Sequence, residues 1–189
     1  MFSYEKADII RVTGNSLYVK NDNIEIRPIT LENILDGQNF NSAEELEVFA
    51  HFLEQGHKGY YAYYNGQCAL RTWIFCTQDR CLVGQNFIYN LPTNEVFSGW
   101  SKTNPDFLKL GIFTAALDFA ISDNDDKVVS GYVESSNIAS LKGTKKVGFE
   151  TIMKYHLFVI FKYGLKIKTY QLGKGKCFKP SLGRVINPM

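Results

Sequence analysis

Apolar residues along this chain repeat with two different periods, and the period changes several times. Spacings of three and four residues, typical of amphipathic helices, predict helices over about 42–54, 111–122 and 137–146. Alternating or continuous apolar runs rich in aromatic and β-branched residues predict strands between and around them. These strands are expected over 7–13, 16–28, 59–64, 68–77, 80–89, 95–103, 127–134, 150–162 and 164–172, and a short helix is expected over 31–36.

Local residues mark where several of these elements begin and end. Asn65-Gly66, between two aromatic runs, is the signature of a tight β-hairpin. Asn41 or Ser42 is expected to cap the helix predicted over about 42–54. That helix carries two acidic residues in its first turn, where a helix favours negative charge. Thr30 is expected to cap the short helix over 31–36 in the same way.

Apart from the segment 80–89, the order of these elements is β-β-α-α-β-β-β-α-β-α-β-β. This order fits an α+β (mixed α/β) fold with a central mixed, mostly antiparallel twisted sheet of about six or seven strands and helices on both faces. A chain of 189 residues is long enough for one domain with a sizeable core. We therefore expect a single domain over residues 1–172, followed by a basic C-terminal tail over 173–189.

Composition narrows the class of protein. Hydrophobic residues make up 45% of the chain and charged residues 21%, as in an ordinary globular domain, which argues against disorder. No apolar run reaches the roughly 18–20 residues of a membrane span, and the N-terminus does not resemble a signal peptide, so a cytoplasmic location is expected. The four cysteines form no C-x-x-C pair and there are only three histidines, so we expect reduced thiols and no metal site.

The net charge of +2 conceals an asymmetry along the chain. Residues 151–189 contain eight basic residues and no acidic ones, which leaves a charge of −6 on the first 150 residues. A basic segment attracts anions such as phosphates, an acidic protein, nucleic acid or a membrane surface. Lysines also suit the exposed edge of a sheet, where they block unwanted strand pairing. Charge alone does not separate these two interpretations.

A candidate anion site lies where a predicted strand ends and a predicted helix begins, in TNPDFLKLGIFTAAL over residues 103–117. The first N–H groups of a helix have no partner within the helix, and they lie at the positive end of its dipole. They can bind phosphate without any particular side chain. Gly111 would let a ligand approach this backbone closely.

Two motifs give the segment a family resemblance. The first is a strand–loop–helix motif, matched by Pro105, Phe107 and Gly111, with Thr103 in place of its leading Val. The second, over 135–150, is N-x-x-[AS] followed by K-x-G-F, matched by Asn137, Ser140, Lys146, Gly148 and Phe149. Together these motifs resemble those of the GNAT superfamily of acyl-CoA-dependent N-acyltransferases, over roughly residues 45–162. The resemblance implies a GNAT-like fold.

The resemblance implies that acetyl-CoA or another acyl-CoA is the co-substrate, with no metal. Its diphosphate would lie on the loop and helix start, and its pantetheine arm would lie along the preceding strand. The cofactor-binding residues implied are Ser101, Lys102, Thr103, Lys109, Leu110, Gly111, Ile112, Phe113, Thr114, Asn137 and Ser140. This chain departs from the family at Leu108, Lys109 and Phe113. Phe113 would crowd the loop unless its ring turns inward.

Direct acyl transfer needs a neutral amine, a polarised thioester carbonyl and reactants held together. Glu134, at the end of a strand beside the implied cofactor, and Glu95, on the strand before the loop, are candidate bases, although either could instead be paired structurally. Thr144 takes the place of the family's frequent general acid, a tyrosine, and its hydroxyl is a weaker proton donor. Trp100 and the tyrosines over 60–64 could line an acceptor pocket or belong to the core.

The sequence therefore predicts an N-acyltransferase that moves an acetyl or other acyl group from CoA directly to the amine of a small molecule such as an amino sugar. Two alternatives stay open: a non-catalytic GNAT-fold binding protein with a degraded CoA site, and a protein whose basic tail binds an acidic partner. An acyl carrier protein is a further candidate donor, and a monomer or homodimer is expected. Nucleic acid is not favoured, because no basic strand is interleaved with aromatic residues.

Overall fold

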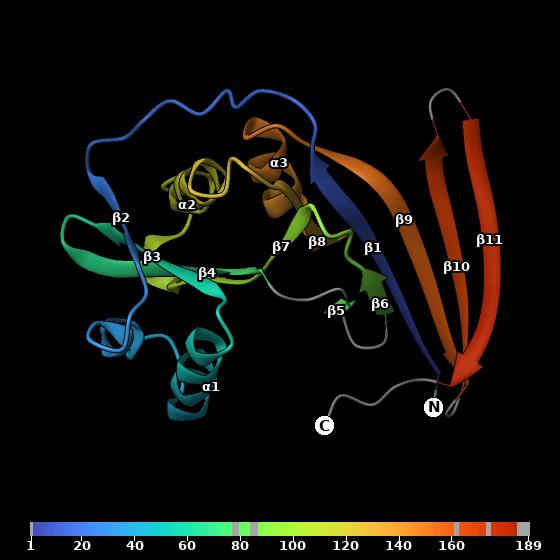
Figure 1. Ribbon diagram of the computed structural model, residues 1–189, viewed down its shortest axis with the longest axis horizontal. Coiled ribbons are helices and arrows are strands. Elements are labelled where there is room, and N and C mark those ends of the chain that lie inside the picture. The colour runs from blue at the N-terminus through green and yellow to red at the C-terminus, as the bar shows by residue number, and fades with distance from the viewer. Residues whose placement is uncertain (1, 77–79, 84–86, 161–162, 173–174, 185–189) are drawn as a thin grey trace.

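The computed structural model of the chain describes residues 2–76, 80–83, 87–160, 163–172 and 175–184, and its main feature is one large twisted sheet (Figure 1). Nine strands form this sheet in the order β11-β10-β9-β1-β8-β7-β4-β3-β2. Their bounds are β1 Phe2–Val12, β2 Ile24–Pro28, β3 Lys58–Tyr64, β4 Gln67–Phe75, β7 Glu95–Thr103, β8 Val128–Glu134, β9 Phe149–Ile160, β10 Tyr163–Leu172 and β11 Gly175–Arg184. In the part of the chain that the structure describes, three α-helices accompany it: α1 Ala43–Glu54, α2 Ile112–Ser122 and α3 Ile138–Lys146.

The helices lie on opposite faces of the sheet, so the predicted fold class is confirmed (Figure 1). Helix α1 buries Phe49 against Tyr61, Tyr63 and Trp73, which project from one face of β3 and β4. Helices α2 and α3 pack on the other face, over a core that includes Ile10, Ile74 and Val129 among others. The sheet has nine strands rather than the six or seven expected, and one of them, β11, lies in the segment that was expected to be a tail.

Strand β1 occupies a central position rather than an edge. It is antiparallel to β8 on one side, over Ala7 to Arg11, and to β9 on the other side, over its whole length. Among the described strands, β7 and β8 are the one parallel pair. The two strands that matter most below are therefore held in place by antiparallel neighbours, β4 beside β7 and β1 beside β8.

Local signals located several elements correctly. Asn65 and Gly66 both adopt positive φ angles, 49° and 81°, as the tight hairpin between β3 and β4 requires. Ser42 caps α1, and the Glu45 side chain accepts a hydrogen bond from the Ser42 N–H in return, which completes a capping box.

The predicted strand over 16–28 is wrong in its first part. Only 24–28 is a strand, and residues 13–23 cross over α2 and α3 without a neighbouring strand (Figure 1). The backbone N–H groups of Thr13 and Gly14 donate to the Gly148 carbonyl, and that of Leu17 donates to the Lys146 carbonyl. The linker therefore pairs with the end of α3, which the alternation of apolar residues could not indicate.

The short helix over 31–36 is also corrected. A 3-10 helix, η1, spans Ile34–Gly37 and is preceded by Asn33. Thr30 does not act as the expected cap, because its N–H donates to the Asn33 side chain, at 2.8 Å. This Asn33 contact holds a turn in place of the predicted helix start.

Two further segments differ from the prediction: 80–89, which was predicted as one strand, and 173–189, which was predicted as a tail. Within 80–89, strands β5 (Arg80–Val83) and β6 (Phe87–Asn90) form a separate two-stranded sheet, and residues 84–86 lie outside the described part of the chain. Residues 175–184 of the expected basic tail form β11, which pairs with β10 at the edge of the main sheet. The side chains after residue 158 are not among those that the structure describes. The role of the basic segment, as an anion-binding surface or as a protected sheet edge, therefore remains a prediction.

Candidate functional site

The parallel strands β7 and β8 separate part-way along their length. They pair from Glu95 opposite Val128 to Ser98 opposite Gly131, and their pairing ends there. Beyond this point β7 continues along β4 as far as Thr103, while β8 continues along β1 as far as Glu134. The two strands thus form a fork, and the inner edge of each strand in the fork has no strand partner among the described residues.

A β-bulge in β7 lies at the start of the fork. Trp73 of β4 is opposite Gly99, but Arg71 is opposite Lys102, so β7 has one residue more than β4 in this stretch. Trp100, in the bulge, has a φ of 52°. A bulge bends its strand and increases its twist. Because the bulge follows directly after Ser98, it accounts for the departure of β7 from β8 at this point.

The open end of β7 leads into the loop before α2, where the backbone is exposed and unpaired. Lys109 and Gly111 adopt positive φ angles of 66° and 77°, and Gly111 is the residue that precedes the helix. Within the described chain, no hydrogen bond is donated by the backbone N–H groups of residues 109–114. A Cβ atom built on Gly111 would meet nothing within 4 Å. Gly111 is exposed and borders open space at the positive end of a helix, so the unpaired N–H groups around it suit an anion such as a diphosphate.

The Phe113 side chain turns away from this loop. It packs in the core between α2 and α3, and its ring would lie 3.0 Å from a Cβ atom at Gly143. The missing side chain at Gly143 therefore makes room for the ring. Thr114 is buried beside it. Phe113 does not block the space at Gly111, so the loop fits a bound diphosphate.

The start of α3 lies next to the open end of β8. Asn137 caps α3 by accepting a hydrogen bond from the Ser140 N–H, at 3.0 Å. The Asn137 N–H in turn donates to the Glu134 carbonyl, at 2.9 Å. The structure therefore places Asn137 and Ser140 beside Glu134, on the β8 side of the fork.

The two candidate bases lie at opposite ends of the β7–β8 pair. Glu95 is buried at the closed end, where it forms an ion pair with Arg11 at 2.7 Å and accepts a hydrogen bond from the Ser130 hydroxyl at 2.6 Å. Glu134 is exposed at the open end of β8, and among the described residues its carboxylate has no hydrogen-bond or ion-pair partner. Thr144 is buried in α3, and its hydroxyl donates to the Leu141 carbonyl at 3.1 Å.

Three residues expected at the cofactor lie on the fork side of the bulge. The Ser101 hydroxyl is 2.7 Å from that of Thr72. The Lys102 ammonium group donates to Glu45 at 2.9 Å, and Thr103 is opposite Leu70 at the end of β7. The side-chain contacts of Ser101 and Lys102 are with β4 and α1, so their backbone groups are what β7 offers to a ligand in the fork.

The predicted aromatic wall is mostly core. Tyr60, Tyr61 and Tyr63 are buried, and burial raises the pKa of each phenol above its usual value. Trp100, by contrast, is 49% exposed, with Phe52 packed edge-on against it at 5.2 Å between ring centres. Trp100 is therefore the one aromatic residue of the predicted set that the structure presents both at the fork and to solvent.

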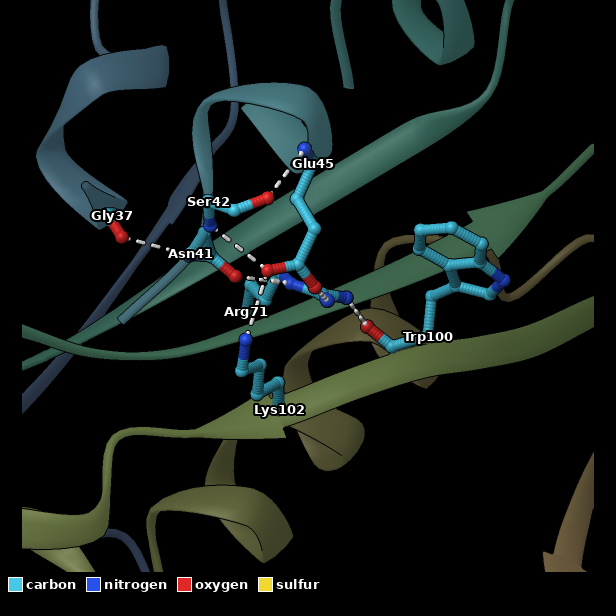
Figure 2. A network of polar contacts seen from close by, with 7 residues as sticks. All are labelled: Gly37, Asn41, Ser42, Glu45, Arg71, Trp100 and Lys102. Atoms are coloured by element: carbon cyan, nitrogen blue, oxygen red, sulfur yellow. Dashed lines mark hydrogen bonds and ion pairs between the residues drawn. The ribbon is translucent and has the colours of Figure 1, made fainter. Parts of the chain in front are cut away.

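Sequence reasoning missed a buried polar network behind the bulge (Figure 2). Arg71, which is only 4% exposed, donates to Asn41 and Glu45 at the start of α1 and to the Trp100 carbonyl. The signal was present in the sequence as a lone arginine within the apolar strand ALRTWIF, since an arginine at a buried strand position needs partners. Within the described residues, no group of three or more His, Cys, Asp or Glu side chains could hold a metal ion.

Comparison with known proteins finds similarity in structure alone. No family model matches the sequence, and neither does any curated protein. An acetyltransferase of the GNAT family from Colwellia psychrerythraea superposes with a TM-score of 0.57 at 12% identity, covering 84% of this chain and 55% of that chain. The chain has the GNAT acetyltransferase fold.

Two further GNAT structures support this assignment of fold. A GCN5-related N-acetyltransferase-like protein from Streptococcus suis gives a TM-score of 0.54 at 15% identity, over 83% of this chain and 61% of that one. A putative GNAT acetyltransferase from Novosphingobium aromaticivorans gives 0.53 at 11% identity, over 82% and 63%. This chain thus spans less than two thirds of each relative, and identities this low establish the GNAT fold alone. The resemblance inferred from the two motifs is confirmed at that level.

No helix of the described chain is both long and apolar enough to cross a membrane.

Proposed function

We propose that this protein transfers an acetyl or other acyl group from CoA to the amine of a small molecule, by direct attack of the amine on the thioester. One observation carries the proposal: the strand fork opens directly into a loop of unpaired backbone N–H groups. The fork supplies extended strand edges that have no strand partner among the described residues, and the loop would supply an anion site at one end of them. An acyl-CoA has the matching shape, a linear arm with a diphosphate at one end.

In this proposal the backbone does most of the binding. The N–H groups of residues 109–114 bind the diphosphate, with Lys109 adding positive charge nearby. The pantetheine arm lies in the fork between β7 and β8, where it pairs with the free edge of β7 beyond Ser98. Asn137 and Ser140, at the start of α3, border the arm from the β8 side.

The reaction requires one bond to form and one to break. The amine nitrogen bonds to the thioester carbon, whose oxygen takes up negative charge and is stabilised by backbone N–H groups of β7 near the bulge. The C–S bond then breaks and CoA leaves as a thiolate, which takes a proton from solvent. Glu134, exposed at the open end of β8, accepts the proton that the amine loses, directly or through water.

Neither of the other two predicted catalytic residues is used in this mechanism. Glu95 lies at the closed end and is engaged by Arg11 and Ser130. The Thr144 hydroxyl donates within its own helix. We propose that the first is a structural link between β7, β8 and β1, and that the second stabilises α3.

The test is a screen for free-thiol release from acetyl-CoA with a panel of primary amines that includes amino sugars. With the best acceptor, Glu134→Gln is expected to lower kcat at neutral pH by about 100-fold, the loss typical of a general base. Glu47→Gln, a change at an exposed position of α1, serves as the control and is expected to retain full activity. If the protein binds CoA but no amine releases thiol, the catalytic part of the proposal fails and the chain is a CoA-binding protein.

A further inference from the structure

Arg71 makes an unusual set of contacts for a residue in the middle of a sheet. Its Nε donates to the Asn41 side chain at 2.6 Å, one terminal nitrogen donates to Glu45 at 2.6 Å, and the other donates to the Trp100 carbonyl (Figure 2). The guanidinium group also lies over the Phe49 ring, 4.8 Å from its centre. All three side-chain nitrogens therefore have partners, which come from β7, from α1 and from Asn41 just before α1.

Glu45 extends the network to the far side of the bulge. Its second carboxylate oxygen accepts hydrogen bonds from Lys102 at 2.9 Å and from the Ser42 N–H at 3.0 Å. The start of α1 is thus connected to β7 on both sides of the extra residue: through Arg71 to Trp100, and through Glu45 to Lys102. Figure 2 shows Lys102 reaching Glu45 from the side opposite to the helix.

Stability alone does not explain this arrangement. An ion pair at a buried position gains little over apolar residues of the same size, because both charges must leave water. Trp100 also adopts a left-handed backbone conformation, which a residue with a side chain keeps only when its surroundings hold it there. Arg71 donates to the carbonyl of Trp100 itself. The network therefore stabilises the bulge conformation at which β7 departs from β8.

We infer that Arg71 is a positioning residue for the acyl donor: it holds the β7 bulge so that the backbone of β7 meets the pantetheine and thioester end of an acyl-CoA. This inference rests on the proposed function. Arg71 touches neither donor nor acceptor. It acts through the peptide of Trp100, while the diphosphate loop beyond residue 108 lies outside the network.

The experiment compares binding of the whole donor with binding of its nucleotide end alone. Binding of acetyl-CoA and of 3′-phosphoadenosine 5′-diphosphate, which is the nucleotide end alone, is measured by calorimetry for the wild type, Arg71→Lys and Glu45→Gln. Arg71→Lys keeps the charge but cannot make the three-way contact. It is expected to weaken acetyl-CoA binding about three- to tenfold, the worth of one misplaced hydrogen bond, and to leave nucleotide binding within twofold.

Glu45→Gln keeps Arg71 in place with a weaker partner, so it tests the same inference should Arg71→Lys fail to fold. It is expected to show a smaller loss in the same direction. Arg27→Lys is the matched control, an exposed arginine on the edge strand β2 whose ion pair is with Glu25 of its own strand and not with the network, and it should change neither affinity. Equal affinities for both ligands in wild type and variants, or equal losses for both ligands, would show a merely structural role and overturn the inference. A wild type that binds neither ligand would overturn the proposed function itself, and the inference with it.

Discussion

At the scale of single residues, the candidate anion site depends on one glycine. Gly111 has a φ of 77° and open space where a side chain would project. An L-residue pays about 1 kcal/mol in this conformation. The empty space also makes this position suitable for a ligand, since no side chain fills it.

Gly111→Ala is therefore expected to lower the free energy of unfolding by about 1 kcal/mol and to weaken CoA binding, because the methyl group projects into the diphosphate's space. The matched control is Gly66→Ala in the β3–β4 turn, which has a similar φ of 81° and equally open surroundings. Urea unfolding should show the same loss for both variants, and calorimetry should show weaker CoA binding for Gly111→Ala alone. Equal CoA affinity in the two variants would contradict the assignment of the loop.

The Glu45 carboxylate gives stability a dependence on pH. Hydrogen bonds from Lys102, the Ser42 N–H and Arg71 lower its pKa to about 2, from an ordinary value of 4.5. In the unfolded chain this group takes up its proton at higher pH than in the folded chain. Its contribution is thus fully present above about pH 4.5 and is lost as the pH falls toward 2.

Glu45→Gln should consequently reduce the melting temperature at pH 6 and should make it fall less steeply between pH 4.5 and pH 3 than that of the wild type. Thermal melts at a series of pH values measure this difference. Glu47→Gln, on the exposed side of the same helix, should follow the wild-type curve. Parallel curves for Glu45→Gln and the wild type would show that the pair does not form in solution.

At the scale of elements, the contact between α2 and α3 keeps the loop clear. Phe113 fits against Gly143 so closely that an added Cβ would lie 3.0 Å from its ring. Gly143→Ala should displace the ring, and Phe113→Leu should relieve that strain. A double-mutant cycle by urea unfolding is expected to show favourable coupling of at least about 0.5 kcal/mol between the two changes. Strictly additive effects would mean that the ring does not pack there.

The elements themselves were largely predictable, because they depend on local signals. The Asn65-Gly66 turn and the Ser42 cap are complete within four residues of sequence. The linker over 13–23 was not predictable, since its partner, the end of α3, lies more than a hundred residues away. The bulge was also missed, because nothing in SGWSK indicates that Trp100 takes a positive φ.

The candidate site was likewise predictable only where it depends on local signals. Its loop and helix start were identified from backbone chemistry and from the GNAT resemblance, which need only a strand–loop–helix order and Gly111. The inward turn of Phe113 depends on Gly143, in another helix. The Arg71 network depends on a residue of α1 and a carbonyl of β7 meeting at β4, which only the folded sheet brings about.

At the scale of the whole molecule, the fork is supported from both sides. Strand β4 holds β7, and the N-terminal strand β1 holds β8 while also pairing with β9. Residues Ala7 and Ile9 of β1 are fully buried in the core. The N-terminal strand therefore helps to hold β8, one of the two strands of the fork, in place.

Deletion of residues 1–12 is expected to abolish cooperative unfolding, because β8 and β9 both lose a partner strand and the core loses its centre. Truncation after Leu172, which removes the edge strand β11, should leave a cooperative transition, since β11 pairs with β10 alone. Circular dichroism melts of the two truncated chains provide the comparison. A cooperative melt of the chain lacking β1, at the wild-type temperature, would contradict its central position.

The central claim is that an acyl-CoA lies in the fork with its diphosphate on the loop. Backbone amide NMR of the ¹⁵N-labelled protein, titrated first with CoA and then with acetyl-CoA, tests this most directly. Resonances of residues 109–114 should shift with either ligand, and those around Gly99 to Ser101 should shift further when the acetyl group is present. Shifts confined to other parts of the molecule, or no shifts at millimolar ligand, would contradict the account.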